Sequence, residues 1–269
     1  MKNKHRRQHW GGKTQDGSRR GDRHDHLLIF GIHAVEAALA NPRRVIRKIA
    51  LSANAERRLQ ESLAARQLEP ERVLPRDLDR RLGEDTVHQG ALVEAEPLPE
   101  PALSALVADM VGRPLLVLDQ VTDPHNVGAI LRSAAVFGAA GLIMTRRHSP
   151  PLDGALAKSA SGALEHVPIA LVQNLARALF ELRQLGVVVV GLDGEAVERL
   201  EDTPWPERAA LLLGAEGKGL RQLTRESCDR LCRIVTDGTF NSLNVANAAA
   251  VALHWTAVQR LGSPPSQRG

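Results

Sequence analysis

The sequence contains no tyrosine, and aromatic residues make up only 3% of its 269 residues. Proteins that read single-stranded nucleic acid often stack the bases on aromatic side chains, and this chain offers few of them. An aromatic platform for base stacking is therefore not expected. If the protein binds nucleic acid, contacts with phosphates and with the shape of the nucleic acid should dominate.

Long apolar runs and a cysteine framework are also absent. No apolar run approaches the roughly 20 residues that cross a bilayer, and the N-terminus lacks the apolar core of a signal peptide. The two cysteines, Cys228 and Cys232, match no metal-binding or disulfide pattern. We therefore expect a reduced, cytoplasmic protein with no metal site and no membrane partner.

Positive charge is concentrated at the N-terminus. Residues 1–26 contain eight Lys or Arg against three Asp, whereas the whole chain has a net charge of only +4. With Trp10 as its only large apolar residue, this segment cannot bury a core and is predicted to be a disordered basic tail. Its charge suits a polyanion such as RNA or DNA, although a solubilising tail would have the same composition.

Residues 27–96 have the pattern of a small α/β unit. We expect a helix at 33–40, an alternating strand at 45–52, a polar helix at 54–67 and a short apolar segment at 90–95. Three prolines follow within residues 96–104 and would interrupt a helix or a central strand. Residues 97–112 are therefore interpreted as a linker.

Residues 113–260 contain short, nearly continuous apolar runs. Such runs are typical of strands buried on both faces, as in parallel sheets. They lie at 114–120, 141–144, 166–170, 186–192, 209–214 and 230–235. Helical patterns separate most of them, for example at 174–185, which predicts an α/β domain with a parallel sheet covered by helices. Residues 261–269 are expected to form a flexible tail.

Ligands of such sheets bind beyond the carboxyl ends of the strands, so the junctions between strand and loop are informative. In the first unusual junction, DPHN forms a turn in which Asn126 is placed to cap a helix, and Arg132 follows six residues later. The third junction places Ser242 and Asn244 before a long alanine-rich helix. Taken singly, each of these residues could be a plain helix cap or a surface charge.

The second junction, GAEGKG, holds Glu216 between glycines. Three glycines in six residues cost conformational entropy, which indicates that the backbone there must be bare. The spacing G-x-x-G-x-G reverses the dinucleotide-binding fingerprint, and the Lys-Ser/Thr pair of a P-loop is missing. A nicotinamide-dependent enzyme and an NTPase are therefore both disfavoured.

Taken together, DPHNVGAILRSA, GAEGKGL and SLNVANAA resemble, in order and spacing, the three motifs of the SpoU (TrmH-type) branch of the SPOUT RNA methyltransferases. This resemblance covers residues 113–260. IFGIHAVEAAL and VHQGALVEA, in the preceding unit, are similar to the small RNA-recognition domain attached to members of this family. The combination is most similar to members that methylate the ribose 2′-oxygen of a guanosine in 23S rRNA.

The resemblance implies a fold and a cofactor. The implied fold is a C-terminal domain tied in a trefoil knot, preceded by an L30e-like α/β domain at 27–96. The family binds S-adenosylmethionine in the knot and works as a homodimer whose site is completed across the interface. Carried onto this chain, Gly214, Ile234 and Leu243 would line the cofactor pocket, and the glycine would let the backbone approach the cofactor closely.

The resemblance also implies roles for side chains. Arg132 would hold an RNA phosphate and stabilise the developing alkoxide, because a guanidinium hardly deprotonates and is therefore a poor general base. Asn126 would orient Arg132 or the ribose, and Glu216 would anchor Arg132 or another polar group. Ser242 and Asn244 would donate or accept hydrogen bonds beside the line of methyl transfer.

One position departs from the family pattern, and two alternatives stay open. Relatives commonly carry serine where this chain has Ala246, so any role of that hydroxyl does not transfer. The chain could be a tRNA methylase of the same fold, although the extra domain at 27–96 favours rRNA. It could also be a catalytically silent RNA-binding relative, although the retained residues at the three motifs favour catalysis.

Overall fold

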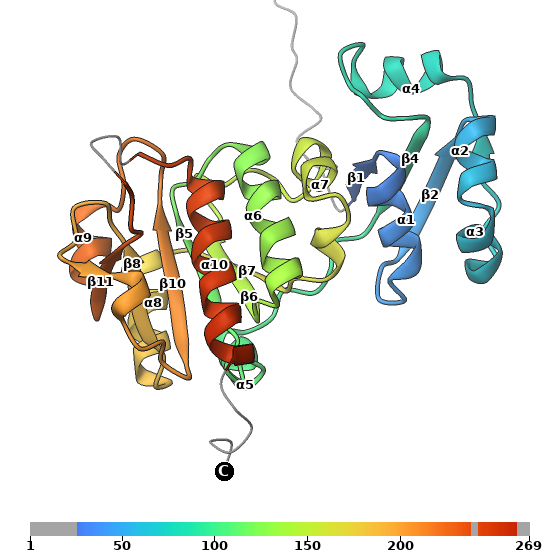
Figure 1. Cartoon of the computed structure of the whole chain (residues 1–269). Helices are drawn as coiled ribbons and strands as arrows, with labels where there is room; N and C mark the ends of the chain where they lie inside the picture. The colour runs from blue at the N-terminus through green and yellow to red at the C-terminus, as the bar shows by residue number, and fades with distance from the viewer. Residues whose placement is uncertain (1–25, 238–241, 263–269) are drawn as a thin grey trace, which may run out of the picture.

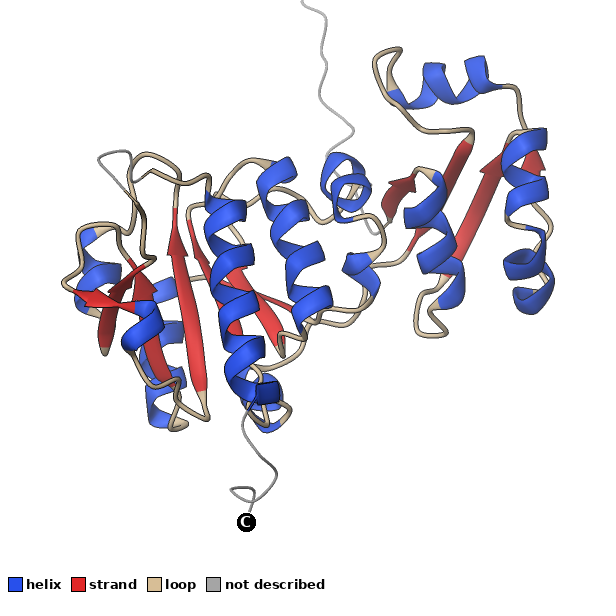
Figure 2. Ribbon diagram, viewed as in Figure 1, coloured by secondary structure: helices blue, strands red, loops and turns tan. Residues whose placement is uncertain are grey.

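The chain folds into an N-terminal and a C-terminal unit, each built from one β-sheet and its helices (Figures 1 and 2). The computed structural model describes residues 26–237 and 242–262. The basic tail predicted for residues 1–26 therefore falls outside the described residues, apart from its last residue, and so do residues 263–269 of the predicted C-terminal tail. Within the described ranges, no helix combines the length and the apolar character that crossing a membrane requires.

The N-terminal sheet has four strands in the order β1-β4-β2-β3. Its elements are β1 (Leu27–Phe30), α1 (Ile32–Ala40), β2 (Ile46–Leu51), α2 (Ala53–Arg58), α3 (Gln60–Arg66), β3 (Glu71–Arg72), α4 (Pro75–Leu82) and β4 (Ala91–Ala95). Strand β4 runs antiparallel to β1 and β2, whereas β3 runs parallel to β2. The predicted first helix and the strand at 45–52 are confirmed, and the apolar segment at 90–95 contains β4. The polar helix predicted at 54–67 is instead two helices, because Leu59 leaves helical geometry and is buried.

The C-terminal sheet has seven strands in the order β7-β6-β5-β10-β8-β11-β9, and every pairing in it is parallel. Its strands are β5 (Leu115–Asp119), β6 (Gly141–Thr145), β7 (Ile169–Val172), β8 (Val188–Leu192), β9 (Glu198–Arg199), β10 (Ala209–Gly214) and β11 (Arg230–Arg233). The parallel sheet predicted from the apolar runs is confirmed. Strand β9 is not predicted from the sequence, because its two residues are too few to carry a periodic pattern.

Helices cover both faces of this sheet, as predicted (Figure 1). They are α5 (Leu103–Ala108), α6 (Pro124–Phe137), α7 (Gly154–Ala160), α8 (Leu175–Gln184), α9 (Gln222–Glu226) and α10 (Val245–Gly262), with 3-10 turns η1 (Ala163–Glu165) and η2 (Leu200–Asp202). Leu116 and Leu118 of β5 are buried with residues of α6 and α10, whereas Leu115 and Val117 are buried with residues of α5 and α8. The strand is apolar at every position because both of its faces are buried.

The segment between the two units is not a simple linker, and the C-terminal helix ends later than predicted. Helix α5 lies inside residues 97–112, and its Leu106 is buried with Met110 in the core shared with α8. The prolines precede this helix and do not interrupt it. At the other end, α10 continues to Gly262, two residues into the segment predicted as a tail.

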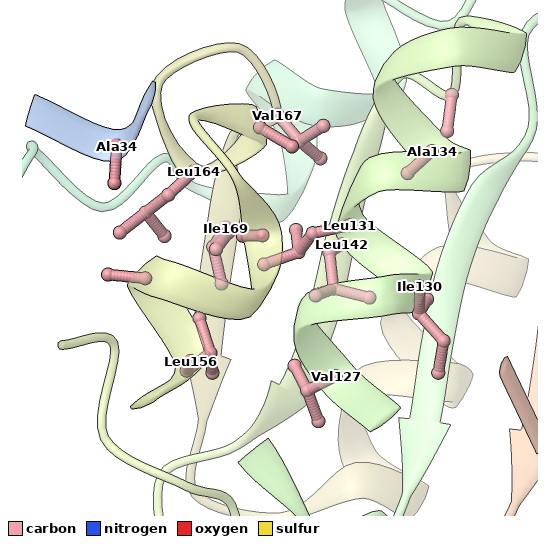
Figure 3. Packing of buried hydrophobic residues seen from close by; sticks show 14 of the residues in the cluster. Ala34, Val127, Ile130, Leu131, Ala134, Leu142, Leu156, Leu164, Val167 and Ile169 are labelled. Atoms are coloured by element: carbon pink, nitrogen blue, oxygen red, sulfur yellow. The ribbon is translucent and has the colours of Figure 1, made fainter. Parts of the chain in front are cut away.

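One hydrophobic core runs from the N-terminal unit into the C-terminal unit. Buried residues of α1, including Ala34, belong to the same cluster as residues of α6, α7 and η1. Figure 3 shows Ala34 beside Leu164 of η1, with Leu131 of α6 and Leu142 of β6 further along the cluster. The two sheets are therefore packed against each other through α1, α7 and η1.

Candidate active site

A cavity of about 340 Å³ opens at the carboxyl edge of the C-terminal sheet. Its lining includes the last residues of three neighbouring strands, Leu192 of β8, Gly214 of β10 and Arg233 of β11. This is the edge at which parallel sheets bind ligands. The three residues expected to line a cofactor pocket, Gly214, Ile234 and Leu243, all line this cavity, as do Glu216 and Ser242.

The glycine turn after β10 folds back onto the end of its own strand. A Cβ atom on Gly214 would lie 2.1 Å from the carbonyl carbon of Gly219 and 2.4 Å from the amide nitrogen of Leu220. The amide of Gly219 donates to the carbonyl of Ala215 at 2.9 Å, and Gly219 itself has a φ of 64°. The bare backbone at Gly214 is thus required by the turn itself, in addition to any approach of a cofactor.

A buried carboxylate anchors the far end of this turn. Asp119, the last residue of β5, is 1% exposed and accepts hydrogen bonds from the Arg221 backbone amide at 3.2 Å and from its Nε at 2.7 Å. Asp119 is not among the site residues predicted from the sequence. The available signal was that Asp119 is the only charged residue in the apolar run at 114–120.

Three of the predicted site residues, one from each motif, lie together. The Asn244 side-chain amide donates to the Asn126 oxygen at 3.0 Å and to Glu216 Oε2 at 3.2 Å. Asn126 Nδ2 donates to the same Glu216 oxygen at 3.4 Å. A single carboxylate therefore accepts from both amides, and the start of α6, the glycine turn and the start of α10 are joined at one point.

Asn126 does not cap its helix, contrary to the sequence prediction. The N-cap of α6 is Asp123, whose side chain accepts from the His125 amide at 3.0 Å, and Pro124 occupies the first helical position. Proline suits that position because its φ is already helical and the amide it lacks would have no partner there. Asn126 is the third residue of the helix, and its side chain reaches Glu216.

Asn244 both caps helix α10 and takes part in the cluster with Asn126 and Glu216. Its Oδ1 accepts from the Ala246 amide at 2.9 Å, the geometry of an N-cap for α10, while its Nδ2 makes the two contacts with Asn126 and Glu216. Ala246, at the position where relatives commonly carry serine, is 8% exposed. Its backbone, and not its side chain, takes part in this arrangement.

Arg132 lies apart from this cluster. Its side chain is exposed on α6 and, among residues 26–237 and 242–262, makes no hydrogen bond or ion pair. Six residues along a helix correspond to a rotation that leaves Arg132 about 120° away from Asn126. Of the partners considered for Glu216, the structure therefore places the two amides beside it and not Arg132.

Two further carboxylates at the cavity were missed from the sequence. Asp193 and Glu195 line it just after β8; Asp193 forms an ion pair with Arg225 at 3.1 Å and accepts from the Glu195 amide at 2.9 Å. The cavity thus combines acceptor groups with apolar walls that include Ile234 and Leu243. These acceptor groups and apolar walls suit a ligand with an apolar ring, hydroxyl groups and a cationic group.

Comparison with protein families accounts for nearly all of the described chain. Residues 113–254 match the SpoU rRNA Methylase family, and residues 28–101 match the family described as RNA 2′-O ribose methyltransferase substrate binding. The first of these matches contains all three motifs and the cavity. The second contains the N-terminal sheet.

Individual relatives agree with the family matches. The chain is 43% identical over 238 residues to the 23S rRNA (guanosine-2′-O-)-methyltransferase RlmB of Ralstonia nicotianae, covering 87% of this chain and 96% of the relative. The crystal structure of the SpoU methyltransferase AviRb from Streptomyces viridochromogenes with the cofactor AdoMet aligns with a TM-score of 0.75 at 25% identity, covering 89% and 92% of the two chains. A structure concerned with 2-OH methylation of C/U34 on tRNA aligns with a TM-score of 0.51 at 28% identity. It covers only 56% of this chain but 99% of its own.

Proposed function

This chain belongs to the SpoU rRNA methylase family, and on that basis we propose that it transfers a methyl group from S-adenosylmethionine to the ribose 2′-oxygen of a guanosine in 23S rRNA. The observation that carries the proposal is the 43% identity to an enzyme of that name, which spans both units of the chain. The tRNA alternative is weaker. The tRNA-related structure aligns with little more than half of this chain, whereas the rRNA relative covers 87%.

The cavity at the carboxyl edge fits the methyl donor. Ile234 and Leu243 would contact the apolar face of the adenine, and the carboxylates of Asp193 and Glu195 suit its ribose hydroxyls and cationic groups. Gly214 would keep the turn folded beside it. When bound, S-adenosylmethionine supplies a sulfonium methyl group that a nucleophile can attack.

The chain's own residues would position the attacking hydroxyl. The carboxylate of Glu216, held by Asn126 and Asn244, is a fixed acceptor at the mouth of the cavity. Such fixed groups lower the barrier by holding the reactants in line before the reaction. Ser242 lines the same cavity and can hydrogen-bond beside this line. Arg132, an exposed guanidinium, would hold a phosphate of the RNA and stabilise the charge that develops on the ribose oxygen.

We infer that a second copy of the chain completes the site. Helices α6 and α10 lie side by side (Figure 1). Arg132 is exposed on α6 together with Val136, which is 76% exposed, and α10 exposes Val251 and Val258. An apolar face of this kind is typical of a protein–protein interface. A homodimer through α6 and α10 would bury these valines and could bring Arg132 to the cavity of the partner.

The family membership also supports finer structural inferences. We infer that the C-terminal domain, residues 113–260, is a SPOUT domain with a trefoil knot, in which the close passage of Gly214 against Gly219 belongs to the knotted region. The unit at 27–96 would be an L30e-like RNA-binding domain, and residues 1–26 a basic arm. With an rRNA substrate, the protein would act in the cytoplasm.

The decisive experiment maps ribose 2′-O-methyl groups in total RNA from cells with and without the gene. We expect loss of one guanosine methyl group in 23S rRNA, restored by the normal gene. A gene carrying Glu216→Gln should not restore the methyl group if the protein is the enzyme. A silent RNA-binding protein would not depend on this carboxylate. Loss of a methyl group in tRNA, or of none in any RNA, would overturn the proposal.

A further inference from the structure

A buried ion pair joins the two units. Arg44, in the loop between α1 and β2, and Glu165, the last residue of η1, have side chains that are only 1% and 3% exposed. Arg44 Nη2 donates to Glu165 Oε1 at 2.7 Å, and Arg44 Nε lies 3.1 Å from Oε2. The two residues are 121 positions apart in the sequence and belong to different units of the chain.

Neighbouring groups complete the hydrogen bonds of this pair. The Asn41 side-chain amide donates to Glu165 Oε2 at 2.8 Å, and Arg44 Nη1 donates to the carbonyl of Glu96 at 2.7 Å. Glu96 is where the chain leaves the N-terminal unit. Arg66 donates to the carbonyls of Asn41 and Arg44 and so holds the loop that carries the guanidinium. Both charged groups are therefore fixed in position and in direction.

Such a pair is weak evidence for stability, because the cost of removing two charges from water offsets much of their attraction. A forked contact between guanidinium and carboxylate is, however, strict about geometry. The apolar core shared by the two units is favourable without a preferred direction, whereas this pair adds a contact of fixed distance and angle. The pair therefore fixes how the two units are oriented relative to each other.

The surroundings link this orientation to the candidate active site. Glu165 follows α7 closely, and α7 packs against α6, the helix that carries Asn126 and Arg132. Gly162, between α7 and η1, approaches α1 so closely that a Cβ there would lie 2.6 Å from the Cβ of Ala37. Figure 3 shows η1, with Leu164, between α1 and α6.

We propose that Arg44 and Glu165 are positioning residues that hold the substrate-binding unit in one orientation relative to the methyl-transfer site. The kinetic part of this inference rests on the proposed function; the structural part does not. RNA bound by the N-terminal unit is thereby presented to the cavity at a fixed distance and angle. Loosening the pair leaves RNA binding intact but misplaces the target ribose.

The test replaces both partners by apolar residues of similar size, Arg44→Met with Glu165→Leu. Because such replacements of buried pairs are often neutral or stabilising, the melting temperature should not fall. Spin labels at Glu61→Cys on α3 and Glu181→Cys on α8, both exposed, report the distance between the units. The native cysteines should escape labelling, because Cys232 is buried and burial raises the pKa of Cys228 to about 12.

We expect one narrow distance distribution in the parent protein and a broad one in the double variant. In methyl transfer to a 23S rRNA fragment, kcat should fall on the order of tenfold, while KM for RNA and the affinity for S-adenosylmethionine stay within about twofold. Arg44→Lys keeps the positive charge but loses the forked guanidinium contact. Its distance distribution and its kcat should lie between those of the parent protein and the double variant. A purely structural role would instead lower the melting temperature and leave kcat per folded molecule unchanged.

Two matched controls sharpen the result. Arg72 and Glu56 form a similar forked pair, but inside the N-terminal unit and at the surface, so Arg72→Met with Glu56→Leu should leave the distance distribution narrow. Gly162→Ala should broaden it, whereas Gly186→Ala should not. Both glycines have positive φ, but only Gly162 faces the other unit, and a Cβ on Gly186 has no neighbour within 4 Å.

The distance measurement needs neither RNA nor methyl donor, so it separates this inference from the proposed function. A narrow, parent-like distribution in the Arg44→Met, Glu165→Leu protein would overturn the inference even if the enzyme methylates 23S rRNA. If that protein does not fold, Arg44→Lys and Gly162→Ala decide by the same measurement. Absence of methyl transfer in the parent protein would instead count against the proposed function alone.

Discussion

The N-terminal and C-terminal units differ in how some of their carboxylates are held. In the N-terminal unit, the exposed arginines Arg72 and Arg81 pair with Glu56 and Glu71, and hydrogen bonds from these arginines lower the pKa of both carboxyl groups. Exposed pairs of this kind contribute only about 0–1 kcal/mol, so an RNA phosphate can replace a carboxylate at little cost. The arginines on this surface are therefore suited to exchanging a carboxylate partner for a phosphate.

In the C-terminal unit, by contrast, two carboxylates are held in place at the carboxyl edge of a buried apolar sheet. Asp119 is fully buried at the end of β5, and Glu216 is held by two amides from distant motifs. These groups keep their positions because the strands beneath them cannot move without disturbing close-packed cores. Under the proposed function, one unit would recruit RNA electrostatically and the other would arrange groups for chemistry.

The largest effect should come from Arg132→Ala, which tests whether the C-terminal unit carries the chemistry. Loss of a group that stabilises developing charge should lower kcat by about 10²–10³-fold, while affinity for S-adenosylmethionine stays nearly unchanged. Arg132→Lys should recover little, because a point charge lacks the two-pronged donor geometry. The measurement is single-turnover methyl transfer together with calorimetry. Arg177→Ala, an exposed arginine on α8, is the control, and near-normal turnover of Arg132→Ala would contradict the role.

Gly214→Ala tests whether the cavity at the strand ends is the cofactor site. The added Cβ would lie 2.1 Å from the carbonyl carbon of Gly219, so the turn must move and the cavity must change shape. We expect affinity for S-adenosylmethionine to fall by about 100-fold, or about 2.8 kcal/mol, in calorimetry. Gly194→Ala, which lines the same cavity with no neighbour within 4 Å of its Cβ, should change affinity by less than about threefold. Equal losses in both variants would refute the specific role of Gly214.

Asn244 separates helix capping from site assembly. Asn244→Ala removes the cap of α10 and both contacts across the motifs, and it should cost about 1 kcal/mol, or roughly 2–4 °C in melting temperature. Asn244→Asp retains a good cap but places a second carboxylate beside Glu216. Its turnover should therefore stay low while its stability recovers most of the loss. Recovery of both together would show that Asn244 serves only the helix.

The smallest effect on turnover should come from the basic tail. Removing residues 2–25 should weaken RNA binding and flatten its salt dependence, since each phosphate contact contributes roughly 0.7–0.9 to the log–log slope. The rate at saturating RNA and the modified nucleotide should be unchanged, because phosphate contacts position RNA without reading its sequence. A salt titration of binding checks this, with a full-length protein carrying Gln at the eight Lys and Arg positions as the control for charge. Equal slopes for all three proteins would leave the tail as a solubilising extension.

The strands of the C-terminal sheet were predictable because their signal is local. A strand buried on both faces is apolar at every position, and β10, at Ala209–Gly214, coincides with the run identified in the sequence. The short strands β3 and β9 and the break at Leu59 carry no such signal. Two residues define no period, and Leu59 is buried by tertiary packing inside an otherwise polar segment.

The sequence by itself determined the parallel α/β architecture, the three motifs and their family, because periodicity and motif spacing are properties of neighbouring residues. Only the tertiary structure decided which residues meet. It placed Asn126 and Asn244 on one Glu216 oxygen, left Arg132 on an outer face, and joined Arg44 to Glu165 across 121 positions. Such contacts depend on how whole elements pack, and neither partner leaves a pattern in the residues beside it.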